Sequence, residues 1–365
     1  MAHPGDVSAL ERLLVDGKVQ ARDIVAVIGK TEGNGGVNDF TRGYFTQSLM
    51  ALLGRHLGEP ADVLVKRIPC VLSGGCEGVL TPHYVVLTIS DDAHAAAGDA
   101  AGNGPALAIG TAMSAPLPAW EVGRLAHIQS VAAAVRTAME RAQITSPGDV
   151  HFVQVKCPCI TAARAEAAKA QGHTVATADP GRSMALARVA GAFGVALALG
   201  EADAAAAVED AMLRDFSVLS NRASISSGVE VEVNEVIGLG NSTAWSGPRR
   251  ISHRPMRDAL DIGAVVDVLA DLGIPAAPQV AAAEAARIAA ILVKCEPDRR
   301  GQVRGQRHTM LDDTDINAQR HIRGAVGGLV AGVLGDTRIF VSGGAEHQGP
   351  DGGGLIAVIA QNSVA

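Results

Sequence analysis

The chain has 365 residues, 48% of them hydrophobic and only 3% aromatic, so it can form a large core or several domains built on Ala, Val, Leu and Ile. Its formal net charge of −7 argues against a nucleic-acid partner, because phosphate binding requires a basic surface. Five cysteines, an odd number, and an N-terminus without a basic, apolar leader favour the reducing cytoplasm, and the apolar runs are too short to predict a membrane span.

The first third of the chain predicts a strand, a helix and two further strands. DIVAVIGKTEG is a continuous apolar run that suits a strand buried on both faces, and it ends near Lys30. DFTRGYFTQSLMALLG predicts a helix of small and apolar residues that carries Arg42. VLSGGCEG then places Ser73 ahead of HYVVLTI, another strand-like run.

The middle third repeats this order after a leading helix, RLAHIQSVAAAVRTAMERA. HFVQVKCPC predicts the buried strand and contains Lys156. The next helix carries Arg188, with Asp179 as its cap and Pro180 in its first turn. ISSGVEVEV contains Ser226 and precedes the strand-like NEVIGLG.

The last third contains the same elements again. AAILVKCEPD predicts the buried strand with Lys294, and the helix that follows carries Arg323 and is expected to be capped by Asp313 or Thr314. VSGGAEHQG contains Ser342, and GLIAVIA is the strand after it.

This repetition predicts an α+β fold of three structurally similar repeat units around a pseudo-threefold axis, because one unit alone would leave a face of its sheet bare. The units are residues 1–103, 111–248 and 254–365, and the boundaries lie near Ala100–Gly110 and Gly247–Pro255. Each lysine lies at the end of its strand and is therefore expected at the rim of its sheet, where the strands end.

Symmetrical packing brings three lysines, three arginines and three serines to one pocket on the axis. We expect this pocket to be strongly cationic and to bind an anion or a ring of carbonyl oxygens. Neighbouring cations lower the pKa of a lysine, and a neutral lysine can deprotonate a serine, so Ser–Lys dyads are expected. In the alternative interpretation each lysine solvates a sheet edge and each Ser-Gly pair only turns the chain.

Other functional motifs are missing. The sequence has no His-x-His or His-Glu-x-x-His zinc motif and no Gly-x-Ser-x-Gly elbow, and GKTEGNGG lacks the spacing of a nucleotide-binding loop. Cys157 and Cys159 have no second pair for zinc and are expected to be buried thiols. The basic run Arg299–His308 predicts a solvated hairpin or a subunit contact in preference to a nucleic-acid site.

GKTEGNGGVNDFTRG, VKCP, NRASISSGVEVEVNEV and FVSGGAEHQGPDGGG together resemble the ring-opening amidohydrolases, the family of cyanuric acid hydrolase and barbiturase, over essentially the whole chain. The resemblance implies a central β-barrel with outer helices, a homotetramer, and hydrolysis of a cyclic amide with no cofactor for catalysis. Cyanuric acid, a ring of three identical C(O)–NH units, matches three protein units and is the expected substrate, with barbituric acid as the alternative. The expected product is carboxybiuret, which loses CO2 to give biuret.

The resemblance and the differences between the units together indicate the reactive pair. Only the middle unit has a second hydroxyl, Ser227, after its repeated serine, so Ser226 is the expected nucleophile and Lys156 its general base. Lys30 and Lys294 are expected to act electrostatically. The expected substrate-binding residues are Arg42, Ser73, Gly74, Arg188, Ser226, Ser227, Arg323, Ser342 and Gly343.

The resemblance further implies a specificity residue and a structural cation. Gln319, one helical turn before Arg323, is expected to discriminate between cyanuric and barbituric acid. Mg²⁺ or Ca²⁺ is expected at the loop AEHQGPDGGG, for which a mobile loop without a cation is the alternative. The expected ligands are Glu296, Ala345, Gln348, Gly349, Pro350 and Gly353.

The cationic pocket also allows a function other than catalysis. A non-catalytic binder of a small oxoanion would use the same cationic residues. The glutamates of the three Ser-x-Gly-x-Glu motifs are expected to make structural hydrogen bonds, and they are Glu77, Glu230 and Glu346.

Overall fold

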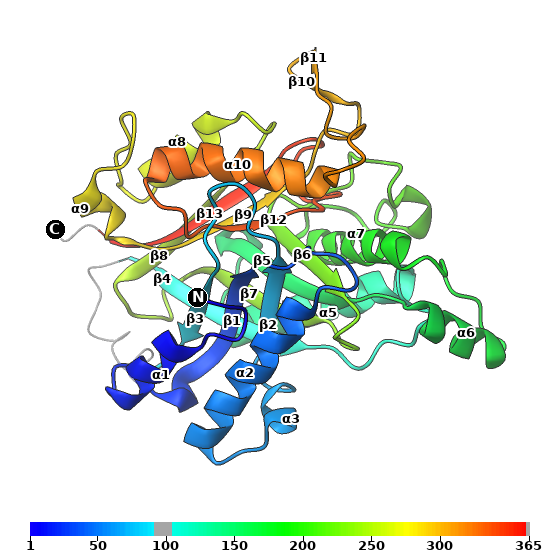
Figure 1. The fold of residues 1–365 in the computed structure, drawn as a ribbon, viewed down its shortest axis with the longest axis horizontal. Coiled ribbons are helices and arrows are strands. Elements are labelled where there is room, and N and C mark those ends of the chain that lie inside the picture. Colours follow the sequence, from blue (N-terminus) through cyan, green and yellow to red (C-terminus); the bar gives the residue numbers. More distant parts are fainter. Residues whose placement is uncertain (91–103, 363–365) are drawn as a thin grey trace.

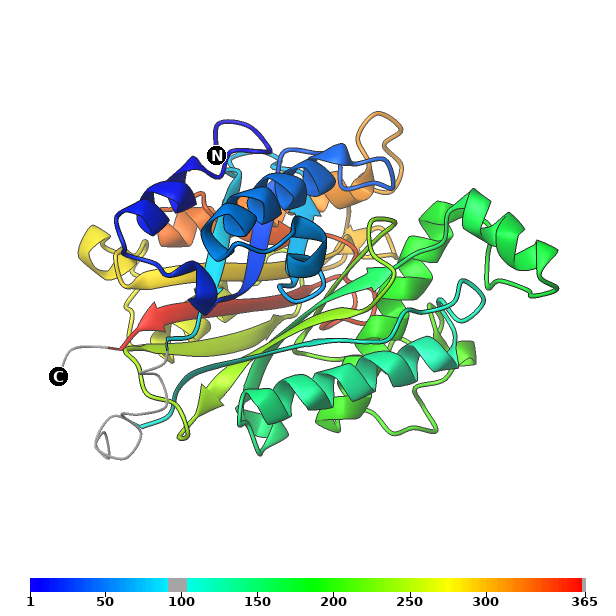
Figure 2. The ribbon, with the colours of Figure 1, turned by 90° about the horizontal axis from the view of Figure 1, so that it is seen from below.

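Figure 1 shows the fold in a computed structural model, which describes residues 1–90 and 104–362. Three mixed β-sheets of three, four and four strands lie in the middle of the molecule, and the longer helices lie outside them. Figure 2 shows α2 and α5 on opposite outer sides of the strands. The α+β class is therefore confirmed.

The elements follow in chain order, sheet by sheet. The first sheet and its helices are α1 Ser8–Val15, β1 Ile24–Thr31, α2 Phe40–Leu57, α3 Ala61–Leu64, β2 Cys70–Gly74 and β3 His83–Thr88. The second comprises β4 Ala106–Met113, α5 Leu125–Arg141, β5 Val150–Pro158, α6 Ala162–Ala170, α7 Pro180–Leu199, β6 Ala223–Gly228 and β7 Glu235–Ser242. The third comprises β8 Arg249–Met256, α8 Ile262–Ala270, α9 Ala282–Ala285, β9 Ile288–Cys295, the hairpin β10 Gln302–Val303 and β11 Gln306–Arg307, α10 Ala318–Leu334, β12 Phe340–Ser342 and β13 Gly354–Gln361.

In each sheet the lysine-bearing strand lies between a parallel and an antiparallel neighbour. Strands β1, β5 and β9 pair in parallel with β2, β6 and β12, which carry the serines, and antiparallel with β3, β7 and β13. A parallel pair needs a crossover connection, and α2, α7 and α10 provide it. The predicted order of lysine strand, helix, serine strand and final strand is present three times.

Two strands were missed by the sequence interpretation, which took their residues for unit boundaries. The described part of Ala100–Gly110 enters β4, and Gly247–Pro255 is mostly β8; residues 100–103 of the first boundary lie outside the described residues. Both are last in the strand order of their sheets, where charge and proline are tolerated. Because β8 contains three arginines and Pro255, its sequence was interpreted as a boundary between units and not as a strand.

One apolar cluster is shared by all three sheets. It contains Ile28 of β1, Phe152 of β5, Leu292 of β9 and Phe340 of β12, each at most 1% exposed. Other clusters join each sheet to its own outer helices. The sheets therefore pack against one another on their inner sides and against helices on their outer sides.

Helix α7 is long and apolar enough, by length and composition, to cross a membrane, but 67% of its most apolar window is buried within the protein, as in a core helix. Asp179 caps it, as predicted, by accepting the N–H of Arg182. The predicted caps of α10 were wrong. Asn317 caps that helix, whereas Asp313 accepts the N–H groups of Asp315 and Ile316 in the preceding turn.

Candidate functional site

The parallel ladders place each repeated lysine directly beside a repeated serine. The register pairs Lys30 with Ser73 in the first sheet, and the Nζ–Oγ distance is 3.2 Å. Lys294 and Ser342 are paired in the same way, with Nζ 3.0 Å from Oγ. Three Ser–Lys neighbours thus follow from strand register, since the middle sheet repeats the pairing.

The middle pair differs in its hydrogen bonds. Lys156 and Ser226 are register partners, but the Lys156 ammonium lies 2.7 Å from Oε1 of Glu230. The buried Oγ of Ser226 has no hydrogen-bond partner among residues 1–90 and 104–362. This hydroxyl is therefore uncommitted, whereas Ser73 and Ser342 each accept a bond from a lysine.

All three lysines are buried, which contradicts the alternative interpretation in which each lysine solvates a sheet edge. Lys30 and Lys294 are 0% exposed and Lys156 is 2% exposed. The pKa of Lys30 and of Lys294 is lowered to about 7, chiefly by burial and next by a nearby guanidinium, that of Arg323 for Lys30 and that of Arg188 for Lys294. The neutral amine is thus well populated near neutral pH. The pKa is lowered mainly by burial, and the expected crowding by other cations is the second cause.

The three glutamates bind the three arginines, so their expected hydrogen-bonding role is confirmed. Each arginine stands on the crossover helix of one sheet and donates Nε to a glutamate that follows the serine strand of another sheet. The pairs are Arg42–Glu230 at 2.9 Å, Arg188–Glu346 at 2.8 Å and Arg323–Glu77 at 2.9 Å. The first pair connects the first sheet to the second, the second pair connects the second sheet to the third, and the third pair connects the third sheet to the first.

Glycine in the Ser-x-Gly-x-Glu motif makes room for these pairs. Gly344 has φ +67°, and a Cβ there would lie 2.5 Å from Nε of Arg188. Gly75 has φ +100°, and its Cβ would lie 2.6 Å from a terminal nitrogen of Arg323. Any side chain at either position would both strain the backbone and displace the arginine.

The serines and arginines converge on one cavity, as the sequence predicted. Lys30 and Lys294 lie behind their serines and do not line it, and each arginine is already paired with a glutamate, so the cavity is less cationic than expected. Gly35, Leu72 and Met184 were not foreseen. The lining residues are Gly35, Arg42, Leu72, Ser73, Gly74, Lys156, Met184, Arg188, Ser226, Ser227, Arg323, Ser342 and Gly343.

Gln319 lies beside this cavity without lining it. Its Oε1 accepts the N–H of Gly344 at 2.6 Å, and a Cβ at Gly343 would approach it to 2.8 Å. Gln319 therefore contacts the loop that holds Ser342. Ser227, the second hydroxyl of the middle unit, donates to the carbonyl of Met184 at 3.0 Å and joins β6 to α7.

Five of the six predicted cation ligands lie in the loop between β12 and β13, and the sixth, Glu296, donates its N–H to the carbonyl of one of them, Gly353. Among the described residues no three His, Cys, Asp or Glu side chains gather as a metal cluster, and the predicted set contains only one carboxylate. The pKa of Glu296 is raised to about 8, chiefly by burial and next by the charges of Glu346 and Asp351. Oδ1 of Asp351 is buried with no partner in the described part of the chain. A hard cation would offset this concentration of negative charge, so the residues fit one.

Three backbone carbonyl oxygens of this loop each accept one N–H, which leaves each of them a second lone pair for a cation. Ala345 accepts from the N–H of Gln348, Pro350 from that of Gly353, and Gly353 from that of Glu296. The N–H of Gly349 donates to the carbonyl of Ser220, which ties the loop to the segment before β6.

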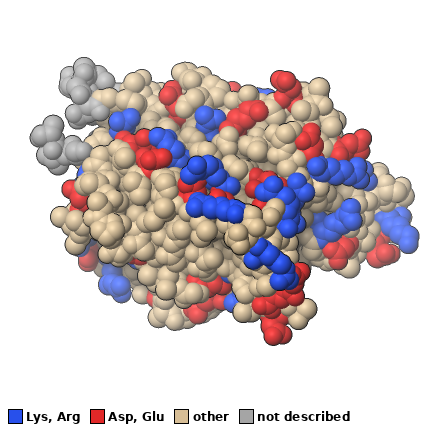
Figure 3. Space-filling view, turned by 90° about the horizontal axis from the view of Figure 1, so that it is seen from above, with Lys and Arg blue, Asp and Glu red and all other residues tan. Residues whose placement is uncertain are grey.

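The basic run is a solvated hairpin with paired charges. Arg299, Arg300 and Arg307 form ion pairs with Asp351, Asp298 and Asp312. On the face of the molecule in Figure 3, basic and acidic side chains are interspersed. Neither observation supports a nucleic-acid surface.

Comparison with known proteins places the chain among relatives of one activity. The family described as amidohydrolase ring-opening protein matches residues 1–361. Cyanuric acid amidohydrolase of Azorhizobium caulinodans is 48% identical over 363 residues, covering 100% of this chain and 97% of the relative, and that of Methylobacterium sp. (strain 4-46) is 49% identical over 365 residues, covering 100% and 95%.

Two solved structures share the fold. A cyanuric acid hydrolase described as an evolutionary innovation by structural concatenation has a TM-score of 0.91 and 44% identity, covering 99% of this chain and 97% of its own. The crystal structure of the A. caulinodans enzyme has a TM-score of 0.89 and 46% identity, covering 100% and 97%.

Breaking one Arg–Glu pair should destabilise the protein. Burial alone would raise the pKa of Glu346, but the Arg188 guanidinium holds that pKa below its usual range. Glu346→Gln leaves a buried guanidinium without a counter-ion, and we expect a loss of about 3–5 kcal/mol in urea unfolding. The loss should shrink as the pH falls below 4.5, the ordinary glutamate pKa, because the unfolded wild-type chain then binds a proton that the native pair excludes, and it should vanish once Glu346 is also protonated in the folded protein. Equal stability of Glu346→Gln and of the exposed control Glu140→Gln would contradict this role.

Proposed function

This chain belongs to the ring-opening amidohydrolase family, and on that basis we propose that it hydrolyses cyanuric acid. The observation that carries the proposal is one cavity lined by a serine from each of three sheets and an arginine from each of three crossover helices. Cyanuric acid presents three identical carbonyl groups, so each Ser–Arg set can face one. An oxoanion binder is less well supported, because each arginine is already neutralised by a glutamate.

The arrangement that we propose is three units, residues 1–103, 111–248 and 254–365, around a pseudo-threefold axis with a central β-barrel. Two features support it: the apolar cluster common to the three sheets, and the cyclic order of the Arg–Glu pairs. Five free thiols agree with a cytoplasmic location, and the homotetramer rests on the family resemblance.

In the proposed reaction Ser226 is the nucleophile, supported by its uncommitted hydroxyl. As the neutral amine, Lys156 turns from Glu230 to its ladder neighbour Ser226 and takes the hydroxyl proton onto its lone pair while Oγ attacks a ring carbonyl carbon. The C–N bond breaks and Lys156 returns the proton to the departing nitrogen. Water then hydrolyses the acyl-enzyme to carboxybiuret, which loses CO2 to give biuret.

The remaining residues stabilise and position in this scheme. Ser73 and Ser342, each bonded to a buried lysine, polarise the other two carbonyl oxygens. Gln319 tunes the choice between cyanuric and barbituric acid through the loop of Ser342, because it holds the N–H of Gly344. Mg²⁺ or Ca²⁺ at Glu296 and the neighbouring carbonyl oxygens stabilises that loop and takes no part in the chemistry.

A spectrophotometric assay tests the function directly. Purified protein should abolish the ultraviolet absorbance of cyanuric acid and release biuret, and it should act more slowly on barbituric acid, which lacks one ring nitrogen and leaves polar groups of the site unpaired. Faster turnover of barbituric acid would reverse the substrate assignment. Saturable binding without ring opening would identify a binder.

Substitution of the middle serine tests the nucleophile. Ser226→Ala and Lys156→Ala should each lower kcat by at least about 10³-fold while ligand binding persists, because only acylation is lost. Ser73→Ala and Ser342→Ala should retain more activity, since they remove one polarising hydroxyl each. Substantial activity in Ser226→Ala, with loss in either other variant, would move the nucleophile to another sheet.

Exhaustive chelation tests the cation. We expect the melting temperature to fall and to recover on addition of Mg²⁺ or Ca²⁺, because an ion that binds only the folded state stabilises it. Glu296→Gln should melt at the same temperature with and without chelator. Unchanged melting and activity of the chelated wild type would indicate a loop that holds no cation.

A further inference from the structure

Each Ser–Lys neighbour has a third residue on the far side of the lysine. The antiparallel ladders pair Lys30 with His83, Lys156 with Glu235 and Lys294 with Leu355. Residues directly opposite one another project from the same face of a sheet. Each sheet therefore carries a transverse row of serine, lysine and a third residue, and the third residue differs in chemistry from sheet to sheet.

Glu235, the third residue of the middle row, is a buried carboxyl with an unused oxygen. It is 6% exposed, and its Oε2 has no hydrogen-bond partner in the described part of the protein. Burial raises its pKa to about 7, against the opposing effects of Lys156 and of the hydrogen bond from the Cys70 backbone. This carboxyl can therefore take up and release a proton near neutral pH.

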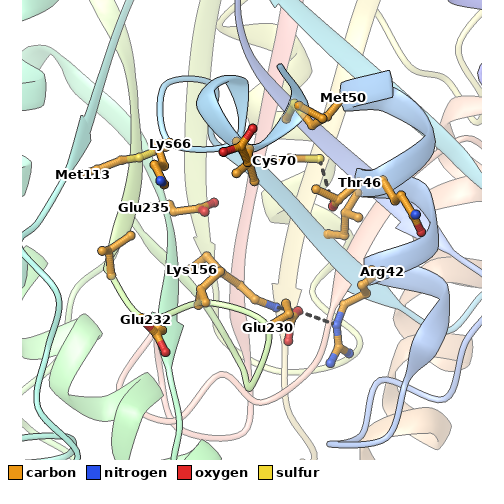
Figure 4. Close-up of a pocket in the computed structure, with 18 of the residues that line it drawn as sticks. Arg42, Thr46, Met50, Lys66, Cys70, Met113, Lys156, Glu230, Glu232 and Glu235 are labelled. Carbon is orange, nitrogen blue, oxygen red and sulfur yellow. Dashed lines mark hydrogen bonds and ion pairs between the residues drawn. The ribbon is translucent and has the colours of Figure 1, made fainter. Parts of the chain in front are cut away.

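Glu235 also lines a second cavity, of about 770 Å³, shown in Figure 4. Lys156 lines both this cavity and the central one, so it lies between them. The second cavity opens to solvent, because three of the residues that line it are exposed: Asp62, Lys66 and Glu232. The other charged side chains that line this cavity are Lys156 from β5, Arg42 from α2, Asp62 and Lys66 at α3, and Glu230 and Glu232 from the loop before β7.

We propose that Glu235 is the positioning residue that takes the surplus proton from Lys156 and releases it to solvent through the second cavity. The inference rests on the proposed function, in which hydrolysis of the acyl-enzyme releases a carbamate anion and leaves one proton per turnover on Lys156. An N–H bond of the ammonium breaks with its electron pair kept on nitrogen, and an O–H bond forms on Glu235. Water in the second cavity then accepts that proton.

The other rows offer a weaker acceptor or none. Burial lowers the pKa of His83, and its Nδ1 is bonded to the carbonyl of Thr81. Leu355 has no polar atom in its side chain. The middle row is thus distinguished by a proton acceptor as well as by the free hydroxyl of Ser226, and the two observations are independent.

The test compares Glu235→Gln with Glu232→Gln, the same chemical change in the same cavity but at an exposed carboxylate. Glu235→Gln should lower kcat about 10- to 100-fold with KM changed less than about twofold, and Glu232→Gln should match the wild type. In the wild type, kcat should fall as the pH drops below about 7, where Glu235 is protonated and cannot accept; this component should be missing in Glu235→Gln. Formate should restore activity to Glu235→Ala in a concentration-dependent way, because the cavity can admit a small carboxylate. Wild-type kcat in Glu235→Gln, or a loss that formate does not restore, would overturn the proposal.

An infrared titration decides the inference independently of turnover. A carboxylic acid band should disappear from the wild type as the pH rises through about 7 and be missing from Glu235→Gln. In Lys156→Met the band should persist to higher pH, because the ammonium that favours the carboxylate is gone. A band unaffected by Lys156→Met would show that the two groups are not coupled and overturn the proposal. A wild type that fails to open the ring would instead disprove the proposed function.

Discussion

The parallel pairing of a lysine strand with a serine strand is the constraint on which the site depends. In a parallel ladder with fixed register, Lys30 and Ser73 must project from the same face of the sheet. A slip of one residue would turn one member of the pair to the opposite face. The apolar residues around them, such as Ile28 and Val71, hold this register because they belong to the core shared by the sheets. Packing that stabilises the fold thus also sets the geometry of each dyad.

Burying so many cations requires an acceptor for each, and the acceptors come from other parts of the chain. Lys294 donates to Ser342, to the carbonyl of Gly343 and to the carbonyl of Ile225 in the second sheet. Each arginine likewise reaches a glutamate of a different sheet. An unpaired buried charge costs several kcal/mol, on the order of 3–5, so none of the three sheets can complete its part of the site alone. The three segments therefore complete the site only together.

The sequence predicted elements well where the signal was local and poorly where it depended on distant neighbours. Continuous apolar runs identified the lysine strands, and Asp179 before Pro180 identified a helix start. The burial of Lys30 could not be read from its own strand, because it depends on segments distant in the sequence, such as the helix of Arg323, whose guanidinium lies near it. The partner of Glu346 lies 158 residues away, so only the fold could reveal it. The arginines of β8 obscured an edge strand, since charge is common both there and in linkers.

A symmetrical pocket around a symmetrical ligand still has to react at one place. If all three rows were chemically alike, each would bind a carbonyl equally well and none would be favoured as the nucleophile. Binding depends on what the rows share, the serines and arginines that line the central cavity. Reaction depends on what they do not share, which lies on the far side of each lysine as His83, Glu235 or Leu355. Divergence at a position that does not line the central cavity can select one serine while leaving the threefold recognition intact.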